Sequence, residues 1–198
     1  FEDNCEFADE SLLFSKYIRP TFTVPGDPYN VKITKSEDYE AIIFKTAIGY
    51  DLHKLEDSDD KNSVIFFGGV AVPSKKRVVA HSDGDSVIHA LIDALFSAIG
   101  DTDIGVHFPD NNPQYKGISS VILLQEVAKI YETIGRRVKN ISIIIVIDAP
   151  KLQNIVPEIK ESLADTLNIS PSDIGISCKT TEGTSPDTYI AYASVTVL

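Results

Sequence analysis

Two short stretches of this sequence carry side chains suited to holding a metal ion. In Asp51-Leu52-His53 a carboxylate and an imidazole stand two residues apart, so on an extended chain they point to the same side. His89 follows in a segment with the apolar periodicity of an amphipathic helix. One carboxylate and two imidazoles, with a fourth position left open, are typical of a catalytic zinc site. We therefore predict a metal site, although a lone helix histidine is more often structural.

Other stretches carry groups that bind anions or hydroxyls. Residues 81–85 (HSDGD) precede the helix of His89, where free backbone amides can face an anion. Residues 149–151 (APK) follow a strand, at the end where open α/β sheets often hold ligands, and residues 179–182 (KTTE) offer hydroxyls to phosphate and a carboxylate to Mg²⁺. Residues 103–105 (DIG) and 108–110 (FPD) could bind a polyol. Ordinary capping and solvated loops are the alternatives for all five.

A central helix must hold His89. Asp85 suits its N-cap and Gly100 the residue just past its C-terminus. Asp85, His89 and Asp93 are four residues apart and fall on one stripe beside the apolar face. We expect a neighbouring carboxylate to orient His89, as is usual for histidines that bind metals.

The remaining elements predict an α/β fold, an α+β sandwich with helices on one face of a mixed sheet. Residues 41–53 form a strand with a turn at Gly49, and residues 63–72 form a second strand with a possible bulge at Gly68–Gly69. A second long helix runs from Ser119 or Ser120 to about Ile134. Then follow a central strand buried on both faces, a helix and two strands, over residues 140–148, 157–168, 173–181 and 189–198.

Composition sets broad limits. A chain of 198 residues suits one well-cored domain, which we place at residues 39–198, after an N-terminal extension at 1–38 that could remain from a removed leader. The net charge of -11 argues against nucleic acid as a partner, though not against a small phosphorylated ligand. Two cysteines are too few for a disulfide framework, and no apolar run approaches the about 18 residues of a membrane span.

Taken in order, the motifs resemble the family of 2-C-methyl-D-erythritol 2,4-cyclodiphosphate synthases. The resemblance covers about residues 42–198 and rests on GYDLH, GGVAVP, AHSDGDSVIHALIDAL, GDTDIGVHFPDNNPQYKGISS, DAPKL and KTTEG. It implies conversion of 4-diphosphocytidyl-2-C-methyl-D-erythritol 2-phosphate to the 2,4-cyclodiphosphate and CMP, in the non-mevalonate route to isoprenoid precursors. It also implies a homotrimer with active sites between adjacent subunits, zinc at the β-phosphate, and Mg²⁺ or Mn²⁺ bridging the diphosphate.

The resemblance also implies roles for single residues. The zinc ligands match Asp51, His53 and His89, and the ligand of the second metal matches Glu182. The residues linked to transition-state stabilisation match His81 and Thr180, with Ser82 and Thr181 at phosphates. The methylerythritol pocket matches Asp103, Ile104, Gly105, Phe108, Pro109 and Asp110. The cytosine-and-ribose pocket of the neighbouring subunit matches Ala149, Pro150, Lys151 and Leu152.

This sequence departs from the family pattern after Glu182. The family usually continues with a loop rich in glycine and arginine, whereas here GTSPDT leads straight to the last strand, and Lys179 stands where threonine or alanine is common. Two other functions therefore stay open: a non-catalytic trimeric module that binds a nucleotide or isoprenoid phosphate, and a generic metal phosphohydrolase. The extension and an excess of isoleucine over leucine suggest a plastid or apicoplast enzyme, with the bacterial cytoplasm as the alternative.

Overall fold

The structure, a computed structural model, describes residues 10–22, 25, 32–36, 43–109 and 111–198. The chain divides into two compact units, Phe1–Glu40 and Ala41–Leu198. The described part of the first contains the helix α1 (Glu10–Tyr17), which buries none of its residues. All the residues with predicted roles lie in the second unit. Among the described helices, none combines the length and apolar character that crossing a bilayer requires.

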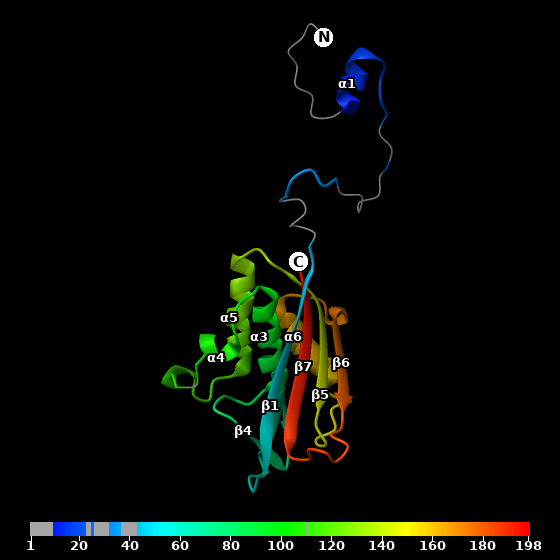
Figure 1. The fold of residues 1–198 in the computed structure, drawn as a ribbon. Helices are drawn as coiled ribbons and strands as arrows, with labels where there is room; N and C mark the ends of the chain where they lie inside the picture. Colours follow the sequence, from blue (N-terminus) through cyan, green and yellow to red (C-terminus); the bar gives the residue numbers. More distant parts are fainter. Residues whose placement is uncertain (1–9, 23–24, 26–31, 37–42, 110) are drawn as a thin grey trace. The chain divides into compact units, whose positions relative to one another are not determined.

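The second unit is built on a five-stranded mixed sheet (Figure 1). Its strands run in the order β4 (Lys76–Val79), β1 (Lys45–Asp57), β7 (Thr188–Val197), β5 (Val138–Val146) and β6 (Ile174–Lys179). Only β5 and β6 pair in parallel, and the other neighbours are antiparallel. A separate hairpin joins β2 (Val64–Phe67) to β3 (Val70–Pro73). The predicted mixed sheet is confirmed.

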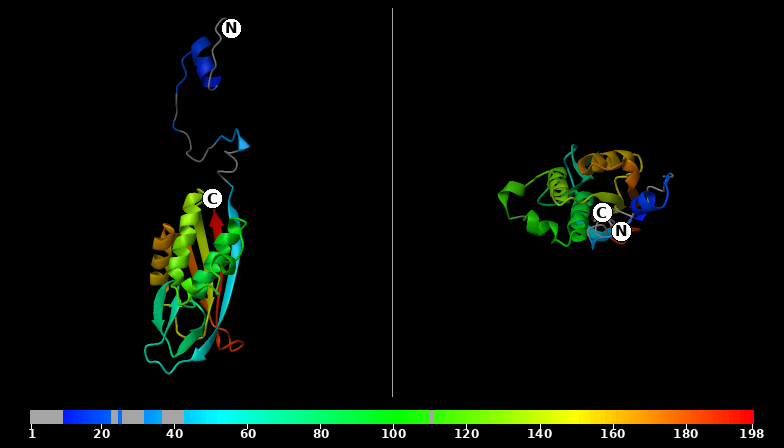
Figure 2. Two further views of the ribbon diagram at one scale, coloured as in Figure 1. Left: turned by 90° about the vertical axis from the view of Figure 1, so that its left-hand side faces the viewer. Right: turned by 90° about the horizontal axis from the view of Figure 1, so that it is seen from above.

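Three long helices cover one face of this sheet, as predicted (Figures 1 and 2). They are α3 (Ser86–Ala98), α5 (Ser120–Thr133) and α6 (Val156–Leu167). Short helical turns occupy Ile104–His107 (α4), Pro113–Tyr115 and Pro171–Asp173. The predicted ends of α3 are confirmed: Asp85 is its N-cap, and Gly100 follows it with φ of 77°.

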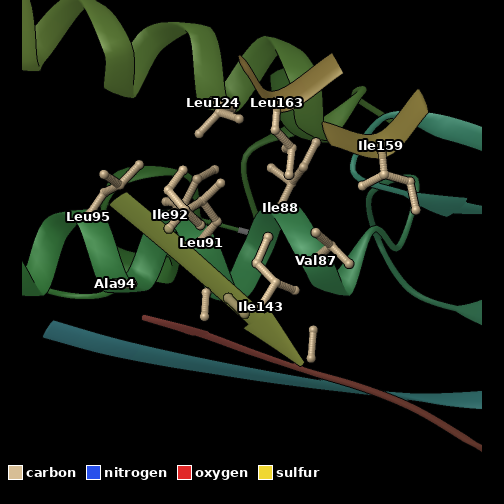
Figure 3. Packing of buried hydrophobic residues seen from close by; sticks show 14 of the residues in the cluster. Val87, Ile88, Leu91, Ile92, Ala94, Leu95, Leu124, Ile143, Ile159 and Leu163 are labelled. Atoms are coloured by element: carbon tan, nitrogen blue, oxygen red, sulfur yellow. The ribbon is translucent and has the colours of Figure 1, made fainter. Parts of the chain in front are cut away.

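The core lies on the helix-covered face of the sheet. Helix α3 packs between the sheet and the helices α5 and α6. Figure 3 shows Ile88, Leu91 and Leu95 of α3 among side chains from β5, α5 and α6. Alanines at 191 and 193 on β7 let α3 approach the sheet closely. Each large aliphatic side chain buried here contributes about 1.5–3 kcal/mol. This packing holds the helix of His89 rigidly over the strand of Asp51.

The Gly68–Gly69 pair forms a hairpin turn rather than the predicted bulge. Both glycines have positive φ, 59° and 86°, and they are the two residues between the paired ends Phe67 and Val70. Two-residue hairpin loops need this left-handed backbone, which glycine adopts without steric cost. The predicted single strand at 63–72 is therefore two strands.

The prediction for residues 140–148 was partly wrong. The strand exists as β5, but β7 is the central strand of the sheet. β5 is buried on one face, because Ile141, Ile143 and Ile145 point to the helices while Ser142 and Ile144 are exposed in the single chain. The isoleucine-rich sequence concealed this alternation, since an apolar residue occupies the outer face as well.

The prediction that the strand turns at Gly49 was wrong. Gly49 lies inside β1, at the point where α3 crosses this strand. A Cβ atom at this position would come within 2.0 Å of the Ala90 carbonyl oxygen and 2.6 Å of the Ala94 nitrogen, both backbone atoms of α3. Only glycine leaves room for this contact.

We expect Gly49→Ala to push α3 away from β1, lowering the free energy of unfolding by about 3 kcal/mol because the core is overpacked. The same shift would separate His89 from Asp51, so metal affinity should fall with stability. Urea unfolding and a zinc-binding titration would measure the two effects. The matched control is Gly175→Ala, where the new methyl group would meet its nearest neighbour at 3.9 Å. Equal losses in both variants would contradict this role for Gly49.

Candidate active site

Asp51, His53 and His89 converge on one point between β1 and α3. Asp51 and His53 lie on the helix-facing side of β1, and His89 lies one turn into α3. His53 Nε2 is 3.3 Å from Asp51 Oδ2 and 3.4 Å from His89 Nδ1, and His89 Nδ1 is 3.8 Å from Asp51 Oδ2. One ligand atom of each residue lies within 4.8 Å of the others. The predicted set is therefore brought together.

The chemistry of this cluster fits a bound cation. Asp51 Oδ2 is buried, and no donor within the described residues meets it in hydrogen-bonding geometry. Buried carboxylate oxygens are costly unless a charge or donor compensates them. Burial alone would raise the pKa of Asp51 and lower that of His89, but their mutual attraction reverses both, so the pKa of Asp51 is lowered and that of His89 raised. A divalent metal ion would satisfy all three groups.

Contrary to prediction, neither acid on the helix stripe orients His89. Asp85 accepts hydrogen bonds from the backbone N–H groups of Gly68, Gly69 and Ile88 at 2.9, 2.6 and 3.2 Å. Asp93 accepts one from the Ile104 N–H at 2.8 Å. Asp85 and Asp93 are therefore structural: Asp85 anchors the β2–β3 turn, and Asp93 anchors the loop before α4.

A pocket of about 250 Å³ opens beside the cluster. Its lining gathers most of the residues predicted for the metal, phosphate and polyol ends of a ligand: Asp51, His53, His81, Ser82, His89, Ile104, Gly105 and Phe108. Tyr115, Ile118 and Leu123 also line it and were not predicted, because the sequence shows only a turn and a helix start there. Asp103 instead caps α4 by accepting from the Gly105 N–H at 2.9 Å, and Asp110 lies outside the described residues.

A second pocket, of about 900 Å³, lies at the carboxyl ends of β5 and β6. It gathers Pro150, Lys151, Leu152, Thr180 and Glu182, together with unpredicted apolar residues such as Ile147 and Ile176. Among the described residues, none lines both pockets. The two halves of the predicted site are therefore separate within one chain.

Asp148, which was not predicted, holds the loop at this second pocket. Its carboxylate accepts hydrogen bonds from the backbone N–H and hydroxyl of Thr181 at 2.8 and 2.7 Å, and these bonds lower its pKa. Thr181 is consequently buried, whereas Thr180 is exposed and donates a hydrogen bond to Glu182. The Thr184 N–H bonds back to the Thr181 carbonyl at 3.0 Å, so GTSPDT makes a tight turn into β7.

The profile of the YgbB family matches residues 44–198. The chain belongs to the YgbB family. It is 42% identical over 141 residues to 2-C-methyl-D-erythritol 2,4-cyclodiphosphate synthase of Caldicellulosiruptor bescii, covering 71% of this chain and 87% of that protein. The resemblance read from the motifs is thereby confirmed.

Two further similarities place this YgbB chain among its relatives. It is 39% identical to the bifunctional enzyme IspD/IspF of Desulforudis audaxviator over 81% of this chain, but it spans only 41% of that longer protein. A solved structure of 2C-methyl-D-erythritol-2,4-cyclodiphosphate synthase in a CDP-bound form shares 35% identity, with a TM-score of 0.71, over 76% of this chain and 98% of that one.

Proposed function

We propose that this chain converts 4-diphosphocytidyl-2-C-methyl-D-erythritol 2-phosphate to 2-C-methyl-D-erythritol 2,4-cyclodiphosphate and CMP. The observation that carries the proposal is the Asp51–His53–His89 cluster opening into a pocket with His81 and Ser82, in a chain of the YgbB family. The similarity to a synthase solved with CDP supports a cytidine nucleotide as the ligand.

The reaction needs positioning more than acid–base chemistry. An oxygen of the 2-phosphate attacks the β-phosphorus, the bond from that phosphorus to the CMP oxygen breaks, and CMP leaves with its electron pair. Both partners belong to one molecule, so holding them in line supplies much of the rate enhancement. His81 and Ser82 would hold the 2-phosphate, while Ile104, Gly105 and Phe108 enclose the methylerythritol and exclude water.

Two metal ions complete the proposed site. Asp51, His53 and His89 would hold zinc, and Glu182 would bind Mg²⁺ or Mn²⁺ together with the diphosphate. Bound metals would supply charge neutralisation at the diphosphate, which explains how a chain of net charge -11 can bind several phosphates. Thr180 would donate to a phosphate oxygen next to the transferred group. Thr181, predicted for the same role, donates its hydroxyl and N–H to Asp148 instead and would hold the loop that presents Thr180.

The cytidine end would be held by a neighbouring subunit in a homotrimer. Pro150, Lys151 and Leu152 line the second pocket, separate from the metal cluster of the same chain, and Ala149 directly precedes them in the sequence. The outer face of the sheet offers the surface for association, because it exposes a band of apolar side chains from β1, β7 and β5: Ile48, Tyr50, Leu52, Ile144 and Tyr192. Exposed apolar patches of this kind mark interaction sites.

Tyr192→Asp is expected to break this association. Tyr192 is 46% exposed in the single chain and pairs across the strands with Tyr50 and Ile144, at the centre of the apolar band. A buried, unpaired carboxylate there would shift the trimer to smaller species and lower turnover at least about 10-fold. Sedimentation velocity would measure the change, with Ile122→Asp on the exposed side of α5 as control. A Tyr192→Asp protein that stays trimeric and active would exclude this face as the interface.

A turnover assay tests the function directly. Purified protein with zinc and Mg²⁺ should release CMP from the named substrate and form the cyclic diphosphate, detectable by ³¹P NMR. Binding of CDP without turnover would favour the non-catalytic module, which the altered loop after Glu182 leaves open. Release of inorganic phosphate from simple esters would favour the phosphohydrolase.

The place where the protein works and the role of residues 1–38 are further proposals. The two relatives named above are bacterial proteins. The finer prediction, a plastid or apicoplast stroma, can be tested by fusing residues 1–38 and then 39–198 to a fluorescent protein in the source cells. Organelle import that needs residues 1–38 would support it.

A further inference from the structure

His89 has one ring nitrogen directed away from the metal cluster, and two serines meet it. Its Nε2 lies 3.0 Å from Ser120 Oγ and 3.2 Å from Ser82 Oγ, while its Nδ1 faces His53 and Asp51. His89 is only 9% exposed and Ser120 is fully buried, so water does not compete strongly for this contact. The partners of Nε2 therefore decide which nitrogen of the neutral ring carries the proton.

The direction of the Ser120 hydroxyl follows from its second partner, Asp83. The Asp83 carboxylate receives the Ser120 hydroxyl on Oδ1 and the Ser120 backbone N–H on Oδ2, the latter at 2.8 Å. A carboxylate only accepts hydrogen bonds, so Ser120 must donate its proton to Asp83. Its oxygen is then left to accept, and the N–H that it can accept is the one on Nε2 of His89.

We infer that Asp83 and Ser120 are positioning residues that hold His89 in the tautomer with its proton on Nε2. This inference rests on the proposed metal site, because its consequence is that the Nδ1 lone pair points at Asp51 and His53. The distance of 3.8 Å from Nδ1 to Asp51 Oδ2 is too long for a competing hydrogen bond that would draw the proton to Nδ1. Nδ1 also meets His53 Nε2 at 3.4 Å, and in the inferred tautomer Nδ1 accepts this hydrogen bond from His53.

The arrangement also ties three segments together. Ser120 is the first residue of α5, Asp83 lies in the HSDGD segment, and His89 is on α3. Because the backbone N–H and the hydroxyl of Ser120 both donate to the Asp83 carboxylate, the Asp83–Ser120–His89 hydrogen-bond relay forms without a bound ligand. Second partners of metal-bound histidines commonly change metal affinity by about 10- to 100-fold.

The tautomer can be observed directly by ¹⁵N NMR of the imidazoles in the metal-free full chain, at a pH where the rings are neutral. Wild type should show His89 with Nε2 protonated. Ser120→Ala should lose this preference and bind zinc about 10- to 100-fold more weakly in a chelator competition. Ser119→Ala is the matched control, since the neighbouring Ser119 makes no side-chain capping bond and should leave both readouts unchanged.

Asp83→Asn is a sharper second variant. The amide oxygen would stay on the Ser120 backbone N–H, leaving the amide nitrogen to donate to Ser120 Oγ. The hydroxyl would then turn and donate to Nε2, moving the ring proton to Nδ1 and weakening zinc binding by a similar factor. A purely structural role for Asp83 would not invert the tautomer.

The outcomes separate this inference from the proposed function. Wild-type His89 protonated on Nδ1, or a tautomer unchanged in both Ser120→Ala and Asp83→Asn, would overturn the relay even if the protein turns over the substrate. The Nε2 tautomer in wild type, with the predicted shifts in the variants, would support the relay even if no CMP were released.

Discussion

Replacing His89 by alanine is expected to remove zinc from the protein and to lower turnover by at least about 10³-fold. Of the three proposed ligands, His89 is the most buried. A catalytic zinc site needs three protein ligands in tetrahedral geometry, and the variant would keep only Asp51 and His53. A loss of this size matches the removal of a preorganised charge from a site of phosphoryl transfer. Metal analysis of the purified variant, followed by the CMP-release assay, would measure both effects.

His107→Ala provides a matched control for this variant. His107 is also an imidazole close to α3, but it stacks on Phe96 at a centroid distance of 4.0 Å and contacts Asp101 rather than the cluster. The control should retain zinc. If His89→Ala retained zinc as well, the assignment of the cluster as a metal site would fail, whatever the effect on turnover.

Replacing Asp85 by alanine is expected to lower the free energy of unfolding by about 4 kcal/mol. The substitution removes the fully buried carboxylate that accepts from the N–H groups of Gly68, Gly69 and Ile88, and each loss at a buried donor costs about 1–3 kcal/mol. Burial raises the pKa of Asp85, so part of this cost is offset because the variant no longer buries a charge. Urea unfolding at fixed protein concentration would measure the difference.

Two further variants test whether the loss of stability in Asp85→Ala comes from the lost hydrogen-bond acceptors. Asp165→Ala removes an exposed carboxylate on α6 and should change stability by no more than about 0.5 kcal/mol. Asp85→Asn keeps one acceptor oxygen and should be less damaging than alanine. A cost for Asp85→Ala as small as that of the surface variant would show that the cap and the hairpin turn do not depend on this carboxylate.

The local elements followed closely from the sequence. The helix around His89 was predictable because its apolar spacing, its capping aspartate and its closing glycine agree with one another. The Asp51–His53–His89 cluster was partly predictable, since the two-residue period of a strand already places Asp51 and His53 on the same side. The contribution of His89 followed from its residue type and from the family motifs, which also indicated the pocket residues.

Glycines show where local patterns were insufficient. Gly49 resembled a turn signal, but it serves a helix that crosses the strand about 40 residues later in the chain, a contact that no local pattern records. The Gly68–Gly69 pair was recognisable as a break, whereas the anchoring of its N–H groups by Asp85 required the packed structure. The β5 strand looked buried on both faces because its outer apolar residues were indistinguishable from core residues.

By itself, then, the sequence determined the long helices and most of the strands, the family, and the residues able to bind metal and phosphate, because these depend on residue type and short-range spacing. The tertiary structure alone decided that Ser120 and Asp83 contact each other and His89, and that the metal-binding cluster and the residues predicted for the cytidine end lie at separate pockets of one chain. Those features depend on contacts between residues more than 30 positions apart, such as Asp83 with Ser120, and hydrogen-bond direction emerges only when such partners are brought together in a packed core.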